Sequence, residues 1–156
     1  MAALIELALG ASYFLAGRPA EAVPVFEHAL GDLDYRGPAL ILSNLSYALT
    51  LSNRPDEGVA RAREAIRRMP TLCAAYYHRG LAQEGRKDTA SAMEAYSTLE
   101  RTCPGESIGG RLRSACLMAQ GGSAEARPQL TAVIDEAPNT PIADEARACL
   151  ALLGAG

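Results

Sequence analysis

The sequence predicts an all-α protein built as a solenoid of antiparallel helix pairs, and three observations support this fold class. Apolar residues recur at helical spacing along the chain. Prolines recur every 34 residues, at Pro70, Pro104 and Pro138. Alanine supplies much of the 49% hydrophobic content, which favours closely packed helices over a β-sandwich. A helix–turn–helix repeat cannot bury its apolar faces alone, so successive repeats are expected to stack.

The clearest copy of the repeat runs from Cys73 to Pro104. Its apolar residues keep helical spacing up to about Gln83, after which a polar stretch breaks the pattern. Asp88 is a good N-cap for a second apolar helix, and Pro104 ends that helix. This stretch is therefore predicted to form one helical hairpin.

Similar copies precede and follow this hairpin. Small residues recur where two helices must cross closely, at Gly10, Ser46, Gly80 and Ser114, and again at Ala22, Gly58, Ala92 and Ala126. One step is 36 residues long, because two extra residues fit around Tyr35–Gly37. The predicted organisation is a single domain over 1–156, with repeats at about 3–36, 39–72, 73–106 and 107–140 and a capping helix at about 141–153.

The order of residue types in the first copy resembles the tetratricopeptide repeat. The residues that carry the resemblance are Leu9-Gly10, Tyr13, Gly17, Ala22, Phe26 and Ala29-Leu30. The resemblance implies a right-handed α-solenoid that acts as a protein-interaction scaffold. The third and fourth copies depart from the pattern, since Arg79 and Arg113 replace an apolar residue and Gly110 replaces a large one. These two copies are expected to pack less typically.

The resemblance also implies where a partner binds, because the first helix of each repeat lines a concave groove. The residues that it places on or beside this groove are Leu7, Ala11, Phe14, Leu40, Ser43, Asn44, Tyr47, Ala74, Tyr77, His78, Leu81, Ile108, Arg111, Ala115 and Met118. Most are apolar, so the predicted ligand is an apolar or amphipathic peptide or helical segment of another protein. One subtype of the family captures terminal carboxylates with Lys, Asn and Arg side chains; only Asn44 matches it, so that clamp is not expected.

Two alternatives to partner binding remain open. The groove or the apolar first helix (about 2–16) could meet a second copy and form a homo-oligomer, or the chain could be a sensor or regulatory domain of a larger protein. The first helix shows apolar residues all round, which favours either a preceding repeat or another chain beside it.

Charge and hydropathy exclude several partners. The net charge of −3 and the pI near 5.4 argue against nucleic acid, which attracts basic surfaces. A helix at about 55–68 carries four arginines, but interleaved glutamates favour a solvated outer face. No apolar run is long enough for membrane insertion and the N-terminus lacks a basic leader pattern, so a cytoplasmic location is expected.

The cysteines and histidines do not predict catalysis, a metal site or a cofactor. No pair of cysteines has C-x-x-C spacing; Cys116 and Cys149 are predicted to be reduced core residues. A bond between Cys73 and Cys103 is conceivable, although reduced thiols are favoured. His28 is predicted to be solvated, and His78 to have no Cys, Ser or Asp partner.

Helix starts are predicted from polar side chains before apolar runs. Asn53 or Asp56 is the expected cap of the helix at about 55–68, Ser123 of the second helix of the fourth repeat, and Thr140 of the last helix.

Overall fold

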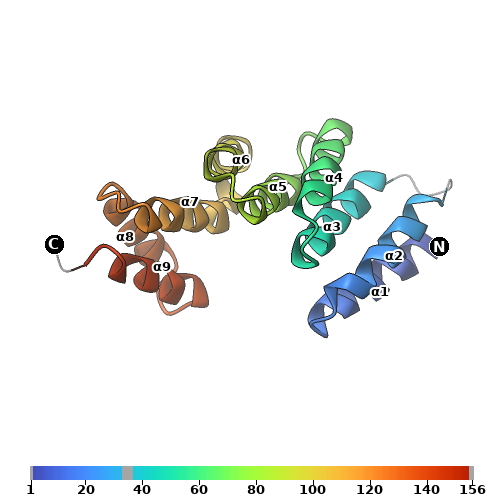
Figure 1. Ribbon diagram of the computed structural model, residues 1–156, viewed down its shortest axis with the longest axis horizontal. Coiled ribbons are helices and arrows are strands. Elements are labelled where there is room, and N and C mark those ends of the chain that lie inside the picture. Colours follow the sequence, from blue (N-terminus) through green and yellow to red (C-terminus); the bar gives the residue numbers. More distant parts are fainter. Residues whose placement is uncertain (1, 33–36, 155–156) are drawn as a thin grey trace. The chain divides into compact units, whose positions relative to one another are not determined.

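The computed structural model describes residues 2–32 and 37–154, so the predicted insertion at Tyr35 and Arg36 lies outside the described residues. The described residues form nine α-helices and one short 3₁₀ helix, without a β-strand, which confirms the all-α prediction (Figure 1). They divide into two compact units, Met1–Ala92 and Met93–Gly156, and each is described by itself. The single domain expected from the repeats stays a prediction.

The first unit contains two helical hairpins and the helix that follows them. Its helices are α1 (Ala2–Leu15), α2 (Pro19–Leu30), α3 (Pro38–Leu51), α4 (Pro55–Arg68) and α5 (Cys73–Gly85). Helix α1 packs on α2 and α3 packs on α4, while α2 also contacts α3 and α5 contacts both α3 and α4. The hairpins are therefore stacked as the repeat requires.

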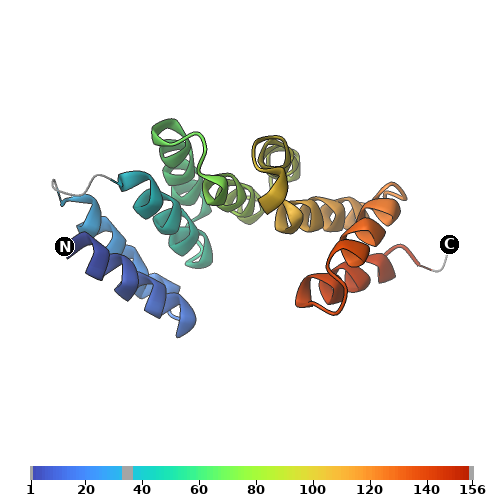
Figure 2. The same cartoon turned by 180° about the vertical axis from the view of Figure 1, so that it is seen from behind.

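The second unit begins within α6 (Thr89–Thr102), which starts in the first unit. The 3₁₀ helix η1 (Pro104–Glu106), α7 (Ile108–Gln120), α8 (Ala126–Glu136) and α9 (Pro141–Ala151) follow. Helices α7, α8 and α9 all contact one another, and Figure 2 shows the three together. The last helix therefore covers the final hairpin, as the predicted capping helix should.

One backbone turn recurs at the same place in four successive hairpins. A residue with positive φ follows the first helix of each hairpin, and the next residue donates its N–H to a carbonyl oxygen five positions earlier, which is the Schellman motif. The bonds are Arg18 to Tyr13 (2.8 Å), Arg54 to Leu49 (2.9 Å), Asp88 to Gln83 (3.0 Å) and Ser123 to Met118 (3.0 Å). The positive-φ residues are Gly17, Asn53, Lys87 and Gly122, so the repeat is visible in the backbone even where the sequence departs from it.

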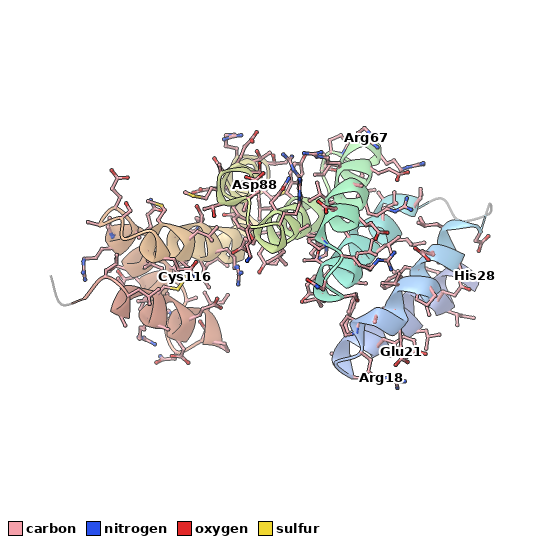
Figure 3. The ribbon with its side chains drawn as sticks, viewed as in Figure 1. Arg18, Glu21, His28, Arg67, Asp88 and Cys116 are labelled. Atoms are coloured by element: carbon pink, nitrogen blue, oxygen red, sulfur yellow. A yellow bond between two sulfur atoms is a disulfide. The ribbon has the colours of Figure 1, made fainter. Side chains whose placement is uncertain are left out.

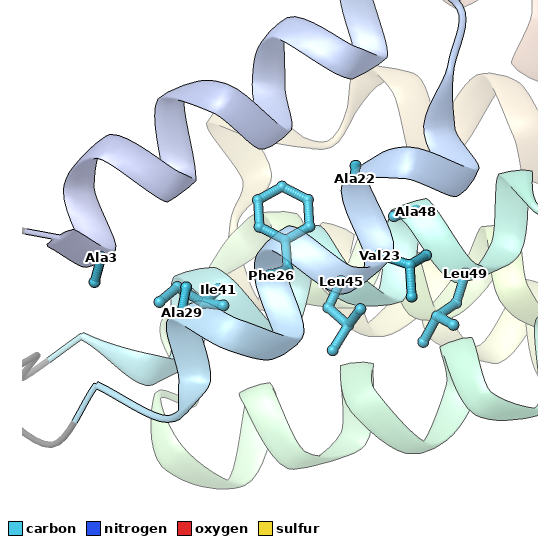
Figure 4. Close-up of a cluster of buried hydrophobic side chains, with 9 residues drawn as sticks. All are labelled: Ala3, Ala22, Val23, Phe26, Ala29, Ile41, Leu45, Ala48 and Leu49. Atoms are coloured by element: carbon cyan, nitrogen blue, oxygen red, sulfur yellow. The ribbon is translucent and has the colours of Figure 1, made fainter.

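The core of the first unit forms where α1, α2 and α3 meet. Phe26, Ile41 and Leu45 are fully buried there, and Figure 4 shows the cluster that they build with smaller side chains. Each such side chain contributes about 1.5–3 kcal/mol by leaving water. A methyl group at Gly10 would collide with the Phe26 ring, so glycine lets α1 approach α2 closely.

The core of the second unit is closed by a disulfide. Cys116 of α7 and Cys149 of α9 are bonded, with their Cα atoms 5.3 Å apart, and both are buried among apolar side chains that include Leu112 and Leu130 (Figure 3). The burial predicted for these cysteines is correct, but the prediction that they are reduced is wrong. The helical periodicity of the sequence indicated that each cysteine faces the core. It could not indicate that α9 packs against α7.

Cys73 and Cys103 lie in different units, at the start of α5 and just after α6. The sequence favoured reduced thiols for both, and this prediction is wrong, because each is disulfide-bonded. No cysteine among the described residues is a free thiol.

The helix starts agree only partly with the predictions. Asp88 accepts the N–H of Ser91 (3.1 Å) and Thr140 accepts the N–H of Ala143 (3.3 Å), so both are caps as expected. Asn53, Asp56 and Ser123 are not. Arg54 occupies the N-cap of α4, because Pro55 takes the first helical position and Asn53 adopts the positive φ of the turn.

Helix α8 begins at Ala126 after Glu125 and has no side-chain cap. Helix α1 has no local cap either, as its sequence indicated. Instead the Ala3 N–H donates to the carboxylate of Asp32, 29 residues away.

Candidate functional site

A row of aromatic side chains links three first helices of the first unit. Phe14 of α1 lies 5.2 Å from Tyr47 of α3 between ring centroids, and Tyr47 lies 4.9 Å from His78 of α5. The Tyr47 and His78 rings are stacked, with an interplanar angle of 3°, and Tyr77 lies 6.2 Å from His78. Such pairs stabilise the contact beyond the area that they bury. The row brings together residues that the family resemblance placed on one surface.

Sequence reasoning missed the partner of His78. The Nδ1 of His78 lies 2.8 Å from the carbonyl oxygen of Ser43 and 2.9 Å from its Oγ. Because a carbonyl oxygen only accepts, Nδ1 carries the hydrogen. The prediction that His78 has no serine partner is therefore wrong, since stacking of α5 on α3 places a serine 35 positions away beside it.

Burial lowers the pKa of His78 to about 4, and the bond to the Ser43 carbonyl opposes this shift. The imidazole is therefore neutral at pH 7. Ser43 is fully buried, so its hydroxyl is closed to a substrate and the pair acts as a link between α3 and α5.

The other residues predicted to line the groove in the first unit differ in how much of their side chains is exposed. Leu40 is 39% exposed, and Ala11 and Ala74 are also exposed. The half-buried members are Leu7, Phe14, Asn44, Tyr47, Tyr77, His78 and Leu81. Apart from the buried Ser43, these predicted residues retain surface that a ligand can contact.

The predicted residues of the second unit do not behave alike. Ala115 is fully buried in the core, and Ile108 packs against that core. Arg111 and Met118 are half-buried and lie together on a cleft of about 640 Å³ between α6, α7 and α8. The guanidinium of Arg111 pairs with Glu136 of α8. The sequence did not indicate this cleft, because its walls come from three helices whose separation no periodicity records.

Charged side chains elsewhere in the first unit form local pairs at the surface. Arg54 pairs with Glu57 (2.7 Å) on α4, and Glu64 pairs with Arg68 (3.2 Å) and Arg61 (3.4 Å). The bond between Arg54 and Glu57 raises the pKa of the guanidinium and lowers that of the carboxyl. These pairs fit the predicted solvated face of α4, from which Arg67 projects in Figure 3.

His28 is exposed on α2 and contacts Glu6 of α1. In the described parts of the chain, no three His, Cys, Asp or Glu side chains are arranged to hold a metal ion. None of the helices that the structure describes combines the length and apolar character needed to cross a bilayer.

Paired antiparallel helices joined by one recurring turn define a helical repeat protein. Residues 74–105 match the tetratricopeptide repeat family, and the chain shares the fold of solved tetratricopeptide repeat proteins. No protein of curated function matches it by sequence. The recognition of this repeat from the sequence is thereby confirmed.

Several solved structures share the fold at low sequence identity. A tetratricopeptide repeat protein from Parabacteroides merdae superposes with a TM-score of 0.75 at 15% identity over 97% of this chain and 59% of its own. TTC0263, a thermophilic repeat protein of Thermus thermophilus, has a TM-score of 0.76 at 19% identity, covering 97% and 90%. YrrB, described as having an unusual peptide-binding site, has a TM-score of 0.72 at 19% identity, covering 94% and 75%. The chain thus spans 59% of the first of these proteins.

Proposed function

We propose that this protein is a protein-interaction module whose first unit binds an apolar or amphipathic segment of a partner along α1, α3 and α5. The observation that carries the proposal is the row formed by Phe14, Tyr47 and His78, which continues across three first helices. Rigid aromatic side chains supply contact area at low entropic cost and dominate many interfaces. The peptide-binding site named for YrrB supports the same kind of ligand for this fold.

The chemistry beside the row suits a segment with both apolar and polar groups. Leu40 and Leu81 offer apolar contacts on neighbouring helices, and the half-buried Tyr47 and Asn44 supply a hydroxyl and an amide that can bond a ligand backbone. His78 stays neutral at pH 7, so this surface adds no positive charge there. An acidic terminus is therefore not the preferred ligand.

Site-specific crosslinking tests this proposal. A photoreactive residue at Leu40 or Leu81 should crosslink one partner in a cell extract, and mass spectrometry of the crosslinked peptide identifies the bound segment. Leu81→Glu should weaken binding of that segment at least about tenfold, because a carboxylate would be desolvated against apolar side chains.

The exposed Ala60 on the outer helix α4 gives the matched control, both as a crosslinking position and as Ala60→Glu. Equal crosslinking from Ala60 and Leu81, or equal affinity of both variants, would place binding elsewhere on the protein.

A second candidate is self-association through α1. Leu15 is 92% exposed and Ile5 is 63% exposed, and Leu4 and Leu9 of the same helix are exposed as well. Exposed apolar side chains that gather on one element mark many interfaces. Light scattering over a range of protein concentrations tests it: a dimer that Ile5→Lys dissociates supports self-association, whereas a concentration-independent monomer contradicts it.

The compartment needs a separate proposal, because the Cys116–Cys149 disulfide weighs against the predicted cytoplasmic location. Disulfides form and persist mainly in oxidising environments. We infer that the second unit matures where thiols are oxidised. Alkylation of protein taken directly from its source cells, followed by mass spectrometry, should find Cys116 and Cys149 protected; alkylated thiols at both would restore the cytoplasmic prediction.

A further inference from the structure

The cleft of the second unit differs in position from the proposed binding row. It has a volume of about 640 Å³, within the range of protein ligand sites, and opens between α6 and α8 with α7 as its floor. Helices α6 and α8 are the second helices of their hairpins. The family resemblance places the concave groove on the first helices, whereas this cleft is walled by second helices and shares only Arg111 and Met118 of α7 with the predicted groove.

Small side chains on α7 create the floor of the cleft. Gly110 and Ser114 are four residues apart and lie on it, with Met118 one turn further along the same stripe. A methyl group at Gly110 would come within 2.9 Å of Leu99 Cδ2, so α6 and α7 are in close contact there. The short Ser114 side chain leaves space beside this contact that no core side chain fills.

The walls combine apolar and acidic groups. Met93 and Met118 line the cleft from α6 and α7, and the flexible, polarisable methionine side chain adapts to ligands of different shape. Glu94 and Glu100 line it from α6 and are exposed. Among the residues that the structure describes, neither of these carboxylates has an ion-pair partner. The cleft is thus apolar within and negative along one rim.

The one cation on the cleft, among the described residues, does not cancel this charge. Arg111 pairs with Glu136 of α8, so its positive charge is already compensated by a carboxylate. Its Nε is buried without a hydrogen-bond partner, which leaves the guanidinium oriented by Glu136. Glu94 and Glu100 therefore dominate the charge that a ligand meets.

We propose that this cleft is a second protein-docking site, which takes a cationic amphipathic segment of a partner protein. A Leu- or Met-sized side chain of that segment fills the space over Ser114 between Met93 and Met118. Lys or Arg side chains on either side of it pair with Glu94 and Glu100. Complementary charge selects such a segment against acidic ones and speeds its association, and a nucleic acid is repelled by the same carboxylates.

A synthetic peptide tests the proposal directly. The probe is an amphipathic helix of leucine and lysine with blocked ends, and its matched controls carry glutamine or glutamate in place of lysine. Binding to the full oxidised chain is followed by fluorescence anisotropy and by amide chemical shifts. The lysine peptide should shift the amides of Ser97, Ser114 and Ala132, and its affinity should fall at least about tenfold between about 50 and 200 mM salt.

Two variants with matched controls locate the binding. Ala132→Trp adds bulk at the rim of the cleft, whereas Thr131→Trp adds the same bulk at an exposed neighbour on α8 that does not line it. Glu94→Lys with Glu100→Lys reverses the rim charge, whereas Glu125→Lys reverses an exposed charge away from the cleft. The cleft variants should each weaken the lysine peptide at least about tenfold, and the controls should leave its affinity within about twofold.

The possible results distinguish failure of the cleft proposal from failure of the proposed function of the first unit. Shifts confined to the first unit, or equal binding by cleft and control variants, would overturn the second site and leave the row on α1, α3 and α5 untouched. Tighter binding of the glutamate peptide would also overturn it. Self-association that Glu94→Lys with Glu100→Lys abolishes would show that a second copy, and not a separate partner, occupies the cleft.

Discussion

The two units repeat the same hairpin turn but stabilise their helices with different side chains. The cluster around Phe26 in the first unit has five buried residues larger than alanine or cysteine, whereas the cluster around Leu130 in the second unit has three, together with two bonded cysteines. The apolar side chains of the first unit's cluster meet across three helices, α1, α2 and α3. In the second unit, a covalent bond between α7 and α9 joins two helices of the Leu130 cluster.

The comparison teaches that one backbone repeat tolerates two ways of holding its helices together. The Schellman turns at Gly17 and Gly122 are alike, so the path of the chain is set locally. The contacts between buried side chains, by contrast, differ between the two units. Changes at the disulfide, at two close helix contacts, at His78 and at the hairpin turns test how far the units differ.

The largest effect should follow loss of the Cys116–Cys149 bond. The bond closes a loop with a sequence separation of 33, and such a loop contributes about 3–4 kcal/mol by restricting the unfolded chain. Cys116→Ala with Cys149→Ala should therefore lower the free energy of unfolding of the second unit by about this amount. Amide exchange should speed up in α9 and leave α1 to α3 unchanged.

Reduction of a variant with Cys73→Ala and Cys103→Ala is the control for lost packing, since in that background it breaks only the Cys116–Cys149 bond and keeps both of its sulfur atoms. Equal exchange in α9 before and after reduction would mean that apolar packing alone holds the second unit, as in the first.

The next effect should come from filling a close helix contact in the first unit. Gly10→Ala forces a methyl group against the buried Phe26 ring, and overpacking of this kind costs about 1–3 kcal/mol. Gly110→Ala in the second unit should cost less, because its methyl group would lie 2.9 Å from the flexible end of Leu99, whereas at Gly10 it would lie closer still to the Phe26 ring. Urea unfolding of both variants measures the difference. A larger loss for Gly110→Ala would show that the smaller core is the more rigid one.

How much of this organisation the sequence could predict depends on the range of the interactions. The helix pairs follow from local periodicity and from breakers such as Pro104, and they were predicted correctly, although some of the helix starts were not. The caps at Asp88 and Thr140 were also predicted, because a cap is a local bond. Asn53 failed as a cap because the turn uses its backbone in the positive-φ conformation, for which asparagine is equally suited.

Contacts between distant residues were beyond the sequence. The Ser43–His78 bond, the Asp32 bond to α1 and the Cys116–Cys149 bond each join residues that only the stacking of helices brings together. Family resemblance placed Phe14 and Tyr47 on the groove and His78 beside it, because each lies in the first helix of its repeat. It placed Ala115 there as well, although that side chain is buried.

A third difference between the units is a pH dependence that belongs to the first. His78 has a pKa of about 4 when folded and about 6.5 when unfolded. Between these values the unfolded chain binds more protons, so acidification favours unfolding. From pH 6.5 to pH 5 the first unit should lose about 2 kcal/mol of stability, and His78→Phe should remove this part of the loss.

Amide exchange in α3 and α5 at the two pH values checks this prediction, with α8 as the reference, because both histidines of the chain lie in the first unit. The same acid response in the His78→Phe variant would assign it to carboxylates instead.

The smallest effects should appear at the hairpin turns, where the units are alike. Lys87 in the first unit adopts φ of 61°, which costs a residue with a Cβ about 1 kcal/mol relative to glycine. Lys87→Gly should therefore stabilise the turn after α5, while Gly122→Ala, at φ of 76° after α7, should destabilise its turn by a similar amount. Lys87→Ala separates this backbone effect from the loss of the lysine charge, since alanine keeps the Cβ. Thermal unfolding should show opposite shifts for the two glycine exchanges, because the same Schellman hydrogen bond closes both turns. Shifts of the same sign would mean that the turn in one unit is held by its surroundings and not by its own backbone.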